Sequence, residues 1–412
     1  MHGSQDAPGD EAGIVEDLRH RFLERFGGTE GVRFFFCPGR VNLMGAHLDY
    51  NGGPVMPVAL DHGTYLALRT RDDDRVRLAA NLSSTSLEVG LRELPATATG
   101  SWADYPLGVL RHLVLEFGGD AGLEVLFGGN LPIAAGLSSS ASITVGTAFA
   151  ILTVWERERD LFACIRAALS GEREFVGVKC GIMDPYAVAL TQPGHLLWLD
   201  CRDASFELLP LHRGAFEIAV VDSGVSRALA RGAFNERVAQ CAEAFERLKR
   251  ACPEARCLRD VPAEVVEAEA AALGPLLLRR ARHVALEVRR TFAAKHALLR
   301  GDFETLGKLI SSTHESLRDL YEVSTPELDA IVDIARSWPG VLGARLTGAG
   351  FGGCAVIVFR ACSSEGLASY VERGFQDRFG RKPSVYSFRS GGGPRELFPP
   401  GTVGGSERAT GR

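Results

Sequence analysis

The sequence predicts an α+β protein with two domains. Its first half alternates short β-rich segments with Gly, Pro and Asp-Asp breaks, and its second half consists mainly of long helical segments with a few strands between them. Its 412 residues also exceed the ~150 residues of a typical domain. No repeat with a period of about 20–50 residues is visible, which argues against a solenoid or a propeller.

The charge balance and the cysteines narrow the class of protein. Lys and Arg number 46 against 51 Asp and Glu, a net charge of −5 without a basic block, so no nucleic-acid partner is expected. No apolar run approaches the ~20 residues that span a bilayer, and no hydrophobic signal segment opens the chain, so no membrane partner is expected. Nine cysteines without paired spacing suit free thiols in the cytoplasm, and Cys252 with Cys257 lacks the further ligands of a zinc site.

The first half begins with an amphipathic helix. Apolar residues recur at helical spacing over 14–26 until Gly27-Gly28 ends the helix. Residues 1–13 and 399–412 are polar or Gly-rich and are predicted to be disordered tails, which leaves domains at 14–205 and 206–398. Strands are predicted at 32–37, 55–59, 64–69 and 123–127, and a helix at 142–155.

The second half changes character after about residue 206. Its helices are rich in Ala, Leu, Glu and Arg, and its strands are short and β-branched. Helices are predicted at 227–251, 276–299, 303–321 and 326–337, and strands at 216–221, 344–347 and 355–359.

A glycine and three serines precede the helix of the first half. In Gly136-Leu137-Ser138-Ser139-Ser140-Ala141, free backbone N–H groups and the positive end of the helix dipole would converge, which favours a phosphate. A serine hydroxyl there can also bind Mg²⁺. The alternative is that these serines only cap the helix.

A second glycine-rich segment, 348–353, matches G-x-G-x-x-G. A dinucleotide site would require a helix after it, yet the β-rich run 354–359 follows. A Rossmann site is therefore not expected. Glycines between two strands often allow the backbone to approach a ligand or another loop closely, and the alternative is a plain tight hairpin.

The third segment, 38–53, is dense in Gly and in charged and polar residues. Carboxylates and amides beside strands suit either a solvated loop or a carbohydrate site, because adjacent sugar hydroxyls bind such groups.

Together the three segments resemble the motifs of the GHMP small-molecule kinases, and in particular their galactokinase branch. The resemblance spans about residues 34–388 and includes Cys180-Gly181-Ile182-Met183-Asp184, 194–202 and 316–324. It implies a two-domain α+β GHMP kinase fold with the active site in the interdomain cleft. It also implies an ATP-dependent sugar 1-kinase that transfers the γ-phosphoryl group to the anomeric hydroxyl of galactose or a galactose-configured sugar.

Carried over to this sequence, the resemblance assigns roles to individual residues. Asp184 would be the catalytic base and Arg40 its neighbour, a pairing that suits proton acceptance and charge neutralisation. Glu172 and Ser140 would bind Mg²⁺. ATP would be bound by Gly136, Ser138, Ser139, Ser140, Gly348, Gly350 and the aromatic Trp102 and Tyr105, for which a plain core role is the alternative. The sugar would contact Ala46, His47, Asp49, Gly181 and Phe234.

Two of these sugar positions depart from the galactokinase pattern. Ala46 stands where galactokinases carry the Glu that hydrogen-bonds the C6 hydroxyl. The resulting motif Gly-Ala-His is similar to that of galacturonate kinases. Phe234 stands where they usually carry a Tyr. Galacturonate or arabinose is therefore an alternative sugar, and a non-catalytic galactose and ATP sensor is an alternative of another class. The expected partners are ATP and a monosaccharide, with the protein acting as a monomer.

Overall fold

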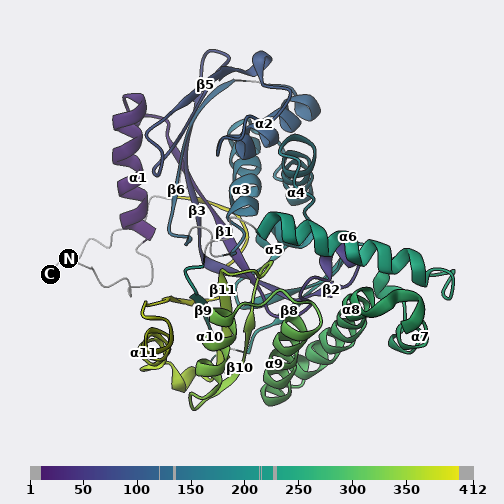
Figure 1. Ribbon diagram of the computed structural model, residues 1–412. Coiled ribbons are helices and arrows are strands. Elements are labelled where there is room, and N and C mark those ends of the chain that lie inside the picture. The colour runs from purple at the N-terminus through teal and green to yellow at the C-terminus, as the bar shows by residue number, and fades with distance from the viewer. Residues whose placement is uncertain are drawn as a thin grey trace.

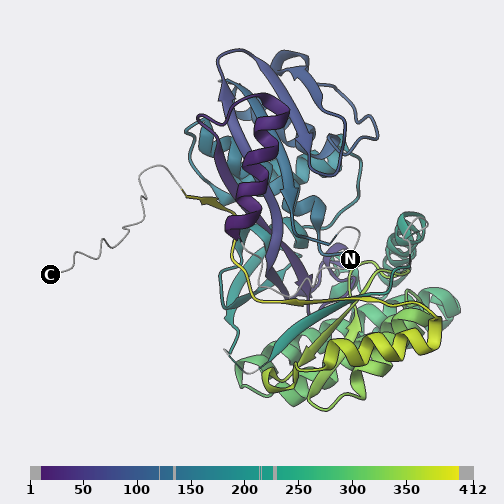
Figure 2. The ribbon, with the colours of Figure 1, turned by 90° about the vertical axis from the view of Figure 1, so that its left-hand side faces the viewer.

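The computed structural model describes residues 11–119, 121–132, 136–212, 214, 216–225 and 230–398. They form two lobes, and most of the first half of the chain lies in one lobe and most of the second half in the other (Figures 1 and 2). The predicted mixture of helices and strands is confirmed.

A six-stranded sheet forms the first lobe. Its order is β13-β1-β3-β6-β4-β5, and the β4–β6 pair is parallel while the others are antiparallel. The strands are β1 (Arg33–Asn42), β3 (Pro57–Arg71), β4 (Arg75–Ala80), β5 (Leu87–Gly90), β6 (Gly122–Gly129) and β13 (Arg395–Leu397).

Helices cover both faces of this sheet because its apolar side chains alternate along each strand. In β1, Phe34 and Phe36 pack with α1 (Glu11–Phe26), whereas Phe35 and Cys37 face the helices of the opposite side. Those helices are α2 (Asp104–Phe117), α3 (Ser139–Val154) and α4 (Leu161–Ser170), and α5 (Met183–Leu190) packs beside them.

The second lobe contains a four-stranded antiparallel sheet of order β10-β11-β9-β12. Alternation again divides its residues: Val221 and Ile357 pack with α10 and α11, and Val220 and Val356 with α8 and α9. The elements are α6 (Ala230–Leu248), α7 (Ala263–Ala268), α8 (Ala270–Leu299), α9 (Phe303–Asp319), α10 (Pro326–Arg336), α11 (Leu367–Phe379), β9 (Glu217–Asp222), β10 (Val341–Leu346), β11 (Cys354–Phe359) and β12 (Ser384–Phe388).

A small three-stranded sheet lies between these parts of the chain. It consists of β2 (Pro54–Val55), β7 (His195–Asp200) and β8 (Ser205–Pro210). Leu197 and Leu199 of β7 pack in the same cluster as Val221 of the second lobe. β7 also contacts β3 of the first sheet. The strand β2, which follows segment 38–53 and pairs with β7, is therefore tied to both lobes.

The structure corrects two details of the predicted elements. The expected tail over 1–13 is wrong for residues 11–13, which begin α1, where Glu11 pairs with Arg395. The predicted strands 55–59 and 64–69 are mostly one long strand, because β3 continues through Gly63, whose missing Cβ leaves room for the Cys37 carbonyl. The predicted tails over 1–10 and 399–412 and the predicted helical residues 227–229 lie outside the described residues.

The last strand crosses between the lobes. β13 leaves the second lobe and pairs with β1, so that Phe34 lies opposite Leu397 (Figure 2). The domain limits 14–205 and 206–398 stay a prediction. Among the helices that the structure describes, none is both long and apolar enough to cross a bilayer.

Candidate active site

A cleft of about 560 Å³ lies where the two lobes meet. Its walls come from the end of β1, the start of α3, the loop before α5, the start of α6 and the loop between β10 and β11. The three glycine-bearing segments singled out in the sequence thus contribute to a single cavity.

An arginine–carboxylate pair stands at the centre of the cleft. Arg40 Nε and Nη2 donate to the two oxygens of Asp184 at 2.7 and 2.6 Å, and Arg40 Nη1 donates to the carbonyl of Gly136 at 2.8 Å. The Ser138 hydroxyl also donates to Asp184. Because Arg40 is 6% exposed and its donors are matched in a fork, the carboxylate is held in one orientation.

The serine segment, residues 136–141, does more than cap the helix α3. Ser138 precedes α3 in a left-handed conformation (φ 59°), and its side chain makes no capping hydrogen bond. Its hydroxyl is instead committed to Asp184, while Ser139 and Ser140 line the cleft beside the free N–H groups of the first turn. The capping alternative therefore does not hold for Ser138.

The start of α3 is anchored to the first sheet. Ser142 Oγ lies 2.7 Å from the carbonyl oxygen of Cys37 and accepts from the N–H of Thr64 at 3.1 Å. Ser142 is fully buried. The position of the serine segment is thus set by β1 and β3.

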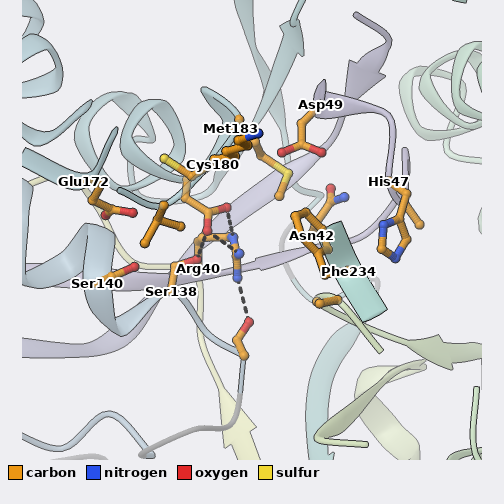
Figure 3. A pocket seen from close by; sticks show the side chains of 18 of the residues that line it. Arg40, Asn42, His47, Asp49, Ser138, Ser140, Glu172, Cys180, Met183 and Phe234 are labelled. Atoms are coloured by element: carbon orange, nitrogen blue, oxygen red, sulfur yellow. Dashed lines mark hydrogen bonds and ion pairs between the residues drawn. The ribbon is translucent and has the colours of Figure 1, made fainter. Parts of the chain in front are cut away.

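Glu172 and Ser140 lie together on one side of Arg40 (Figure 3). Glu172 belongs to a π-helical turn, Gly171–Phe175, and is 4% exposed, with Thr144 Oγ1 at 3.4 Å from its Oε1. Burial, followed by the charge of Asp184, raises its pKa to about 7. A carboxylate and a hydroxyl, both oxygen donors, suit Mg²⁺.

The other side of Arg40 carries Asp49 and His47 (Figure 3). Burial, followed by the charge of Asp184, raises the pKa of Asp49 to about 6. Gly181 approaches this carboxylate so closely that a Cβ there would lie 2.1 Å from Asp49 Oδ2, so a larger residue would displace the Asp49 side chain.

His47 is held neutral among aromatic rings. Its Nδ1 lies 2.8 Å from the Tyr50 hydroxyl, and its ring centroid is 4.7 Å from Tyr321 and 6.0 Å from Phe234. Burial, followed by the nearby His283, Arg345 and Arg237, lowers its pKa to about 3. This corner of the cleft is therefore lined by aromatic rings and offers a neutral imidazole.

Most of the predicted site residues line the cleft. The structure brings together Arg40, Ala46, His47, Asp49, Gly136, Ser138, Ser139, Ser140, Glu172, Gly181, Asp184, Phe234 and Gly348.

Three predicted residues do not line the cleft: Trp102, Tyr105 and Gly350. The half-buried Trp102 packs its ring on Phe127, with the ring centroids 5.8 Å apart, in the core of the first lobe, and Tyr105 lies in the first turn of α2. Gly350 has φ 77°, and a Cβ there would lie 2.3 Å from the carbonyl of Val323. Gly350 therefore lets this loop approach another loop closely, at Val323, and nucleotide contact by Gly350 and by the two aromatic residues stays a prediction.

Several lining residues were not predicted, namely Asn42, Gly177, Val178, Lys179, Cys180, Met183, Asn235, Arg345 and Ala349. Asn42 follows Arg40 by two residues on β1 and so projects from the same face, a spacing that the sequence contains. Arg345 carries no such signal, since it reaches the cleft from β10 by donating to the carbonyls of Asn42, Leu43 and Leu346.

Sequence families match most of the chain. The galactokinase galactose-binding signature matches residues 20–70, the GHMP kinase N-terminal domain residues 104–192, and the GHMP kinase C-terminal domain residues 294–379.

Whole proteins match over nearly the full length. The galactokinase of Enterococcus faecalis is 38% identical over 390 residues, which cover 93% of this chain and 100% of that protein. The galactokinase of Bacillus subtilis is 34% identical over 386 residues, with 93% and 99% covered.

Solved structures agree. Lactococcus lactis galactokinase, crystallised with galactose, superposes with a TM-score of 0.89 at 32% identity, covering 93% of this chain and 100% of that one. Methanococcus jannaschii mevalonate kinase shares the fold, with a TM-score of 0.65 at 20% identity over 89% of this chain and 99% of that one. With the cleft, the sequence families and the relatives in agreement, the chain belongs to the galactokinase family of GHMP kinases.

Proposed function

We propose that this protein transfers the γ-phosphoryl group of ATP to the anomeric hydroxyl of galactose or a galactose-configured sugar. The observation that carries the proposal is the position of the Arg40–Asp184 pair between two unlike sides of one cleft. One side holds the serine segment and Glu172, which suit a nucleotide phosphate, and the other holds Asp49 and His47, which suit sugar hydroxyls.

The chemistry of the pair fits phosphoryl transfer. Asp184 accepts the proton of the anomeric hydroxyl. The hydroxyl oxygen of the sugar attacks the γ-phosphorus, and ADP leaves. Arg40 keeps the carboxylate oriented and offsets negative charge that spreads over the phosphoryl oxygens in the transition state. Ser138 holds the same carboxylate from the start of α3.

Glu172 and Ser140 are the proposed Mg²⁺ residues. The part of the chain that the structure describes contains no cluster of three or more His, Cys, Asp or Glu side chains able to hold a metal ion. The carboxylate of Glu172 and the hydroxyl of Ser140 suit Mg²⁺, which in kinases is bound by one or two carboxylates together with water and substrate phosphates. When bound, Mg²⁺ neutralises charge on the phosphates of ATP.

The first test measures Mg-ATP-dependent ADP release with galactose, galacturonate, arabinose and glucose, and identifies the phosphorylated position of the product. We expect a sugar 1-phosphate, with galactose as substrate. Preference for galacturonate or arabinose would make Ala46 the specificity switch, and no turnover with any sugar would support the sensor alternative. We further propose that the protein is a monomer located in the cytoplasm. Light scattering tests the oligomeric state separately.

Ala46 provides a prediction about specificity. Its methyl group lines the cleft and is 4% exposed, so the residue adds no hydrogen-bond partner beyond its backbone. A glutamate at this position would restore a charge-assisted hydrogen bond to the C6 hydroxyl, which contributes about 1.5–3 kcal/mol. We expect Ala46→Glu to lower the KM for galactose about 10- to 100-fold.

The same variant carries its own control. A carboxylate at position 46 would repel the carboxylate of galacturonate, so Ala46→Glu should weaken any use of that sugar. Unchanged KM values for both sugars would show that residue 46 does not face C6.

Asp49 predicts a pH dependence of sugar binding. Its pKa is raised to about 6, so the carboxylate is ionised above that pH and gains a proton as the pH falls through it. The protonated form loses acceptor capacity for sugar hydroxyls. We expect the KM for the sugar to rise below about pH 6 while the KM for ATP changes less.

The control is Asp49→Asn, which cannot ionise. Its sugar KM should be high at every pH and lack the inflection near pH 6. An inflection that persists in Asp49→Asn would assign the titration to another group.

A further inference from the structure

Helix α8 of the second lobe forms hydrogen bonds with both the N–H and the carbonyl group of Ala46, which belongs to segment 38–53, here called the sugar motif. Glu287 Oε1 accepts from the N–H groups of Gly45 and Ala46 at 3.0 and 3.1 Å. His283 Nε2 lies 3.1 Å from the carbonyl oxygen of Ala46. His283 and Glu287 are one turn apart and so share a face of α8, and both are 0% exposed.

The hydrogen bonds of Glu287 show that it acts as a carboxylate. Its Oε2 accepts from Arg290 Nε and from Thr313 Oγ1, both at 2.8 Å, so four donors surround its two oxygens. Burial works against ionisation, but the charges of Arg290 and Arg345 help to hold its pKa below the usual value. An ionised carboxylate with four donors makes strong hydrogen bonds to both N–H groups of the motif.

The partners of His283 determine its tautomer. A carbonyl oxygen only accepts, so Nε2 must carry the proton that it donates to Ala46. Nδ1 then accepts from the hydroxyl of Ser316, which lies 2.8 Å away. Burial lowers the pKa of His283 to about 4, so the ring is neutral near pH 7 and keeps this single arrangement.

The segment bound by α8 has a backbone conformation that needs support. Gly45 has φ 86° and His47 has φ 59°, and a non-glycine residue rarely adopts such a left-handed conformation without compensation. Ala46 and His47 both line the cleft. Their placement against the sugar therefore depends on contacts that hold the peptide groups in this shape.

Among the residues that the structure describes, no hydrogen bond joins α8 to the serine segment or to Glu172. The serine segment is anchored through Ser142 to Cys37 and Thr64, and through Ser138 to Asp184. Loss of the hydrogen bonds from α8 should consequently disturb sugar binding far more than nucleotide binding.

We propose that His283 and Glu287 are positioning residues of the sugar site, which set sugar affinity by holding the backbone of Gly45 and Ala46 without touching the substrate. The inference rests on the proposed sugar kinase activity. It extends the sugar site from the cleft to a fully buried face of a helix in the second lobe.

The test is Glu287→Gln, assayed with both substrates. A carboxamide offers one accepting oxygen and one NH₂ group, so it cannot accept from the two backbone N–H groups and from Arg290 and Thr313 at once. We expect the KM for the sugar to rise at least about 10-fold and the KM for ATP to change less than about 2-fold, as follows from the loss of about one charge-assisted hydrogen bond.

A matched control is Glu124→Gln. Glu124 is 2% exposed, pairs with Arg69, Arg71 and Arg77 in the first lobe, and does not line the cleft. It loses the same charge from a buried arginine cluster, so it reports what destabilisation alone does to both KM values. We expect its sugar and ATP KM values to stay close to those of the unmodified protein.

His283 provides a second pair of variants in case Glu287→Gln folds poorly. His283→Ala removes the donor to the Ala46 carbonyl and should raise the sugar KM, whereas His283→Gln keeps an N–H donor and should restore part of the affinity. An unchanged sugar KM in the folded variants, or equal changes in both KM values, overturns the inference. Absence of sugar turnover in the unmodified protein overturns the proposed function itself, and the inference with it.

Discussion

Asp184→Asn is expected to reduce kcat by about 10²- to 10⁴-fold, the usual contribution of a general base. The amide keeps the shape of the side chain and can still accept from Arg40, but it cannot take the proton of the sugar hydroxyl. In the proposed site the phosphates of ATP bind the serine segment, so the Kd for ATP is expected to change little. The measurement is steady-state kcat together with ATP affinity by calorimetry.

Asp200→Asn is the matched control for this variant. Asp200 is 9% exposed and accepts from Arg259 Nη1 at 2.5 Å, yet it does not line the cleft. It therefore loses a carboxylate from a buried arginine pair without affecting the proposed chemistry, and kcat should stay near normal. Near-normal turnover in Asp184→Asn would remove the assignment of Asp184 as the base.

Arg40→Met is expected to reduce kcat by about 10³-fold, comparable to the loss of a main electrostatic group in an active site. Methionine fills much of the space of the arginine stem, but it leaves Asp184 without its two charged donors and frees the carbonyl of Gly136. The transferring phosphoryl group also loses a nearby positive charge. The measurement is kcat at saturating sugar and Mg-ATP.

Arg40→Lys separates charge from geometry. A lysine ammonium keeps the positive charge but lacks the planar fork that spans both oxygens of Asp184. We expect it to recover only part of the loss and to remain about 10²-fold below the unmodified protein. Full activity in Arg40→Lys would mean that charge alone is required and that the bidentate geometry has no catalytic role.

The main residues of the cleft could be predicted from local sequence motifs. Arg40, Ser138, Glu172 and Asp184 lie in four separate stretches of sequence, and the resemblance to one kinase family was sufficient to predict all four in one cleft. Arg40, Ser138 and Asp184 stand close to glycines near the end of a strand or the start of a helix, whereas Glu172, in the turn after α4, was assigned by the resemblance alone. Trp102 was harder to interpret, because an aromatic ring suits a nucleotide and a core equally well.

Residues that act through tertiary contacts could not be found in this way. Glu287 and His283 lie in a long helix of ordinary composition, and their spacing of four residues is also typical of a solvent-exposed polar face. Arg345 sits in a short apolar strand and is nonetheless 1% exposed. Only the packing of α8 and β10 against the sugar motif shows that these charged side chains are buried and bonded to its backbone.

The sequence by itself determined the α+β class, most of the helices and strands, the kinase family and the main residues of the cleft. The class and the elements follow from periodicity and turn residues, and the family and the cleft residues follow from the resemblance of short motifs. All of these are properties of neighbouring positions in the chain. The tertiary structure decided that β3 continues through Gly63, that β13 joins the first sheet, that Ser138 bonds Asp184 instead of capping α3, and that α8 holds Ala46. Each of these depends on which groups distant in sequence meet in space, where a missing Cβ, a matched donor or a buried charge determines the arrangement.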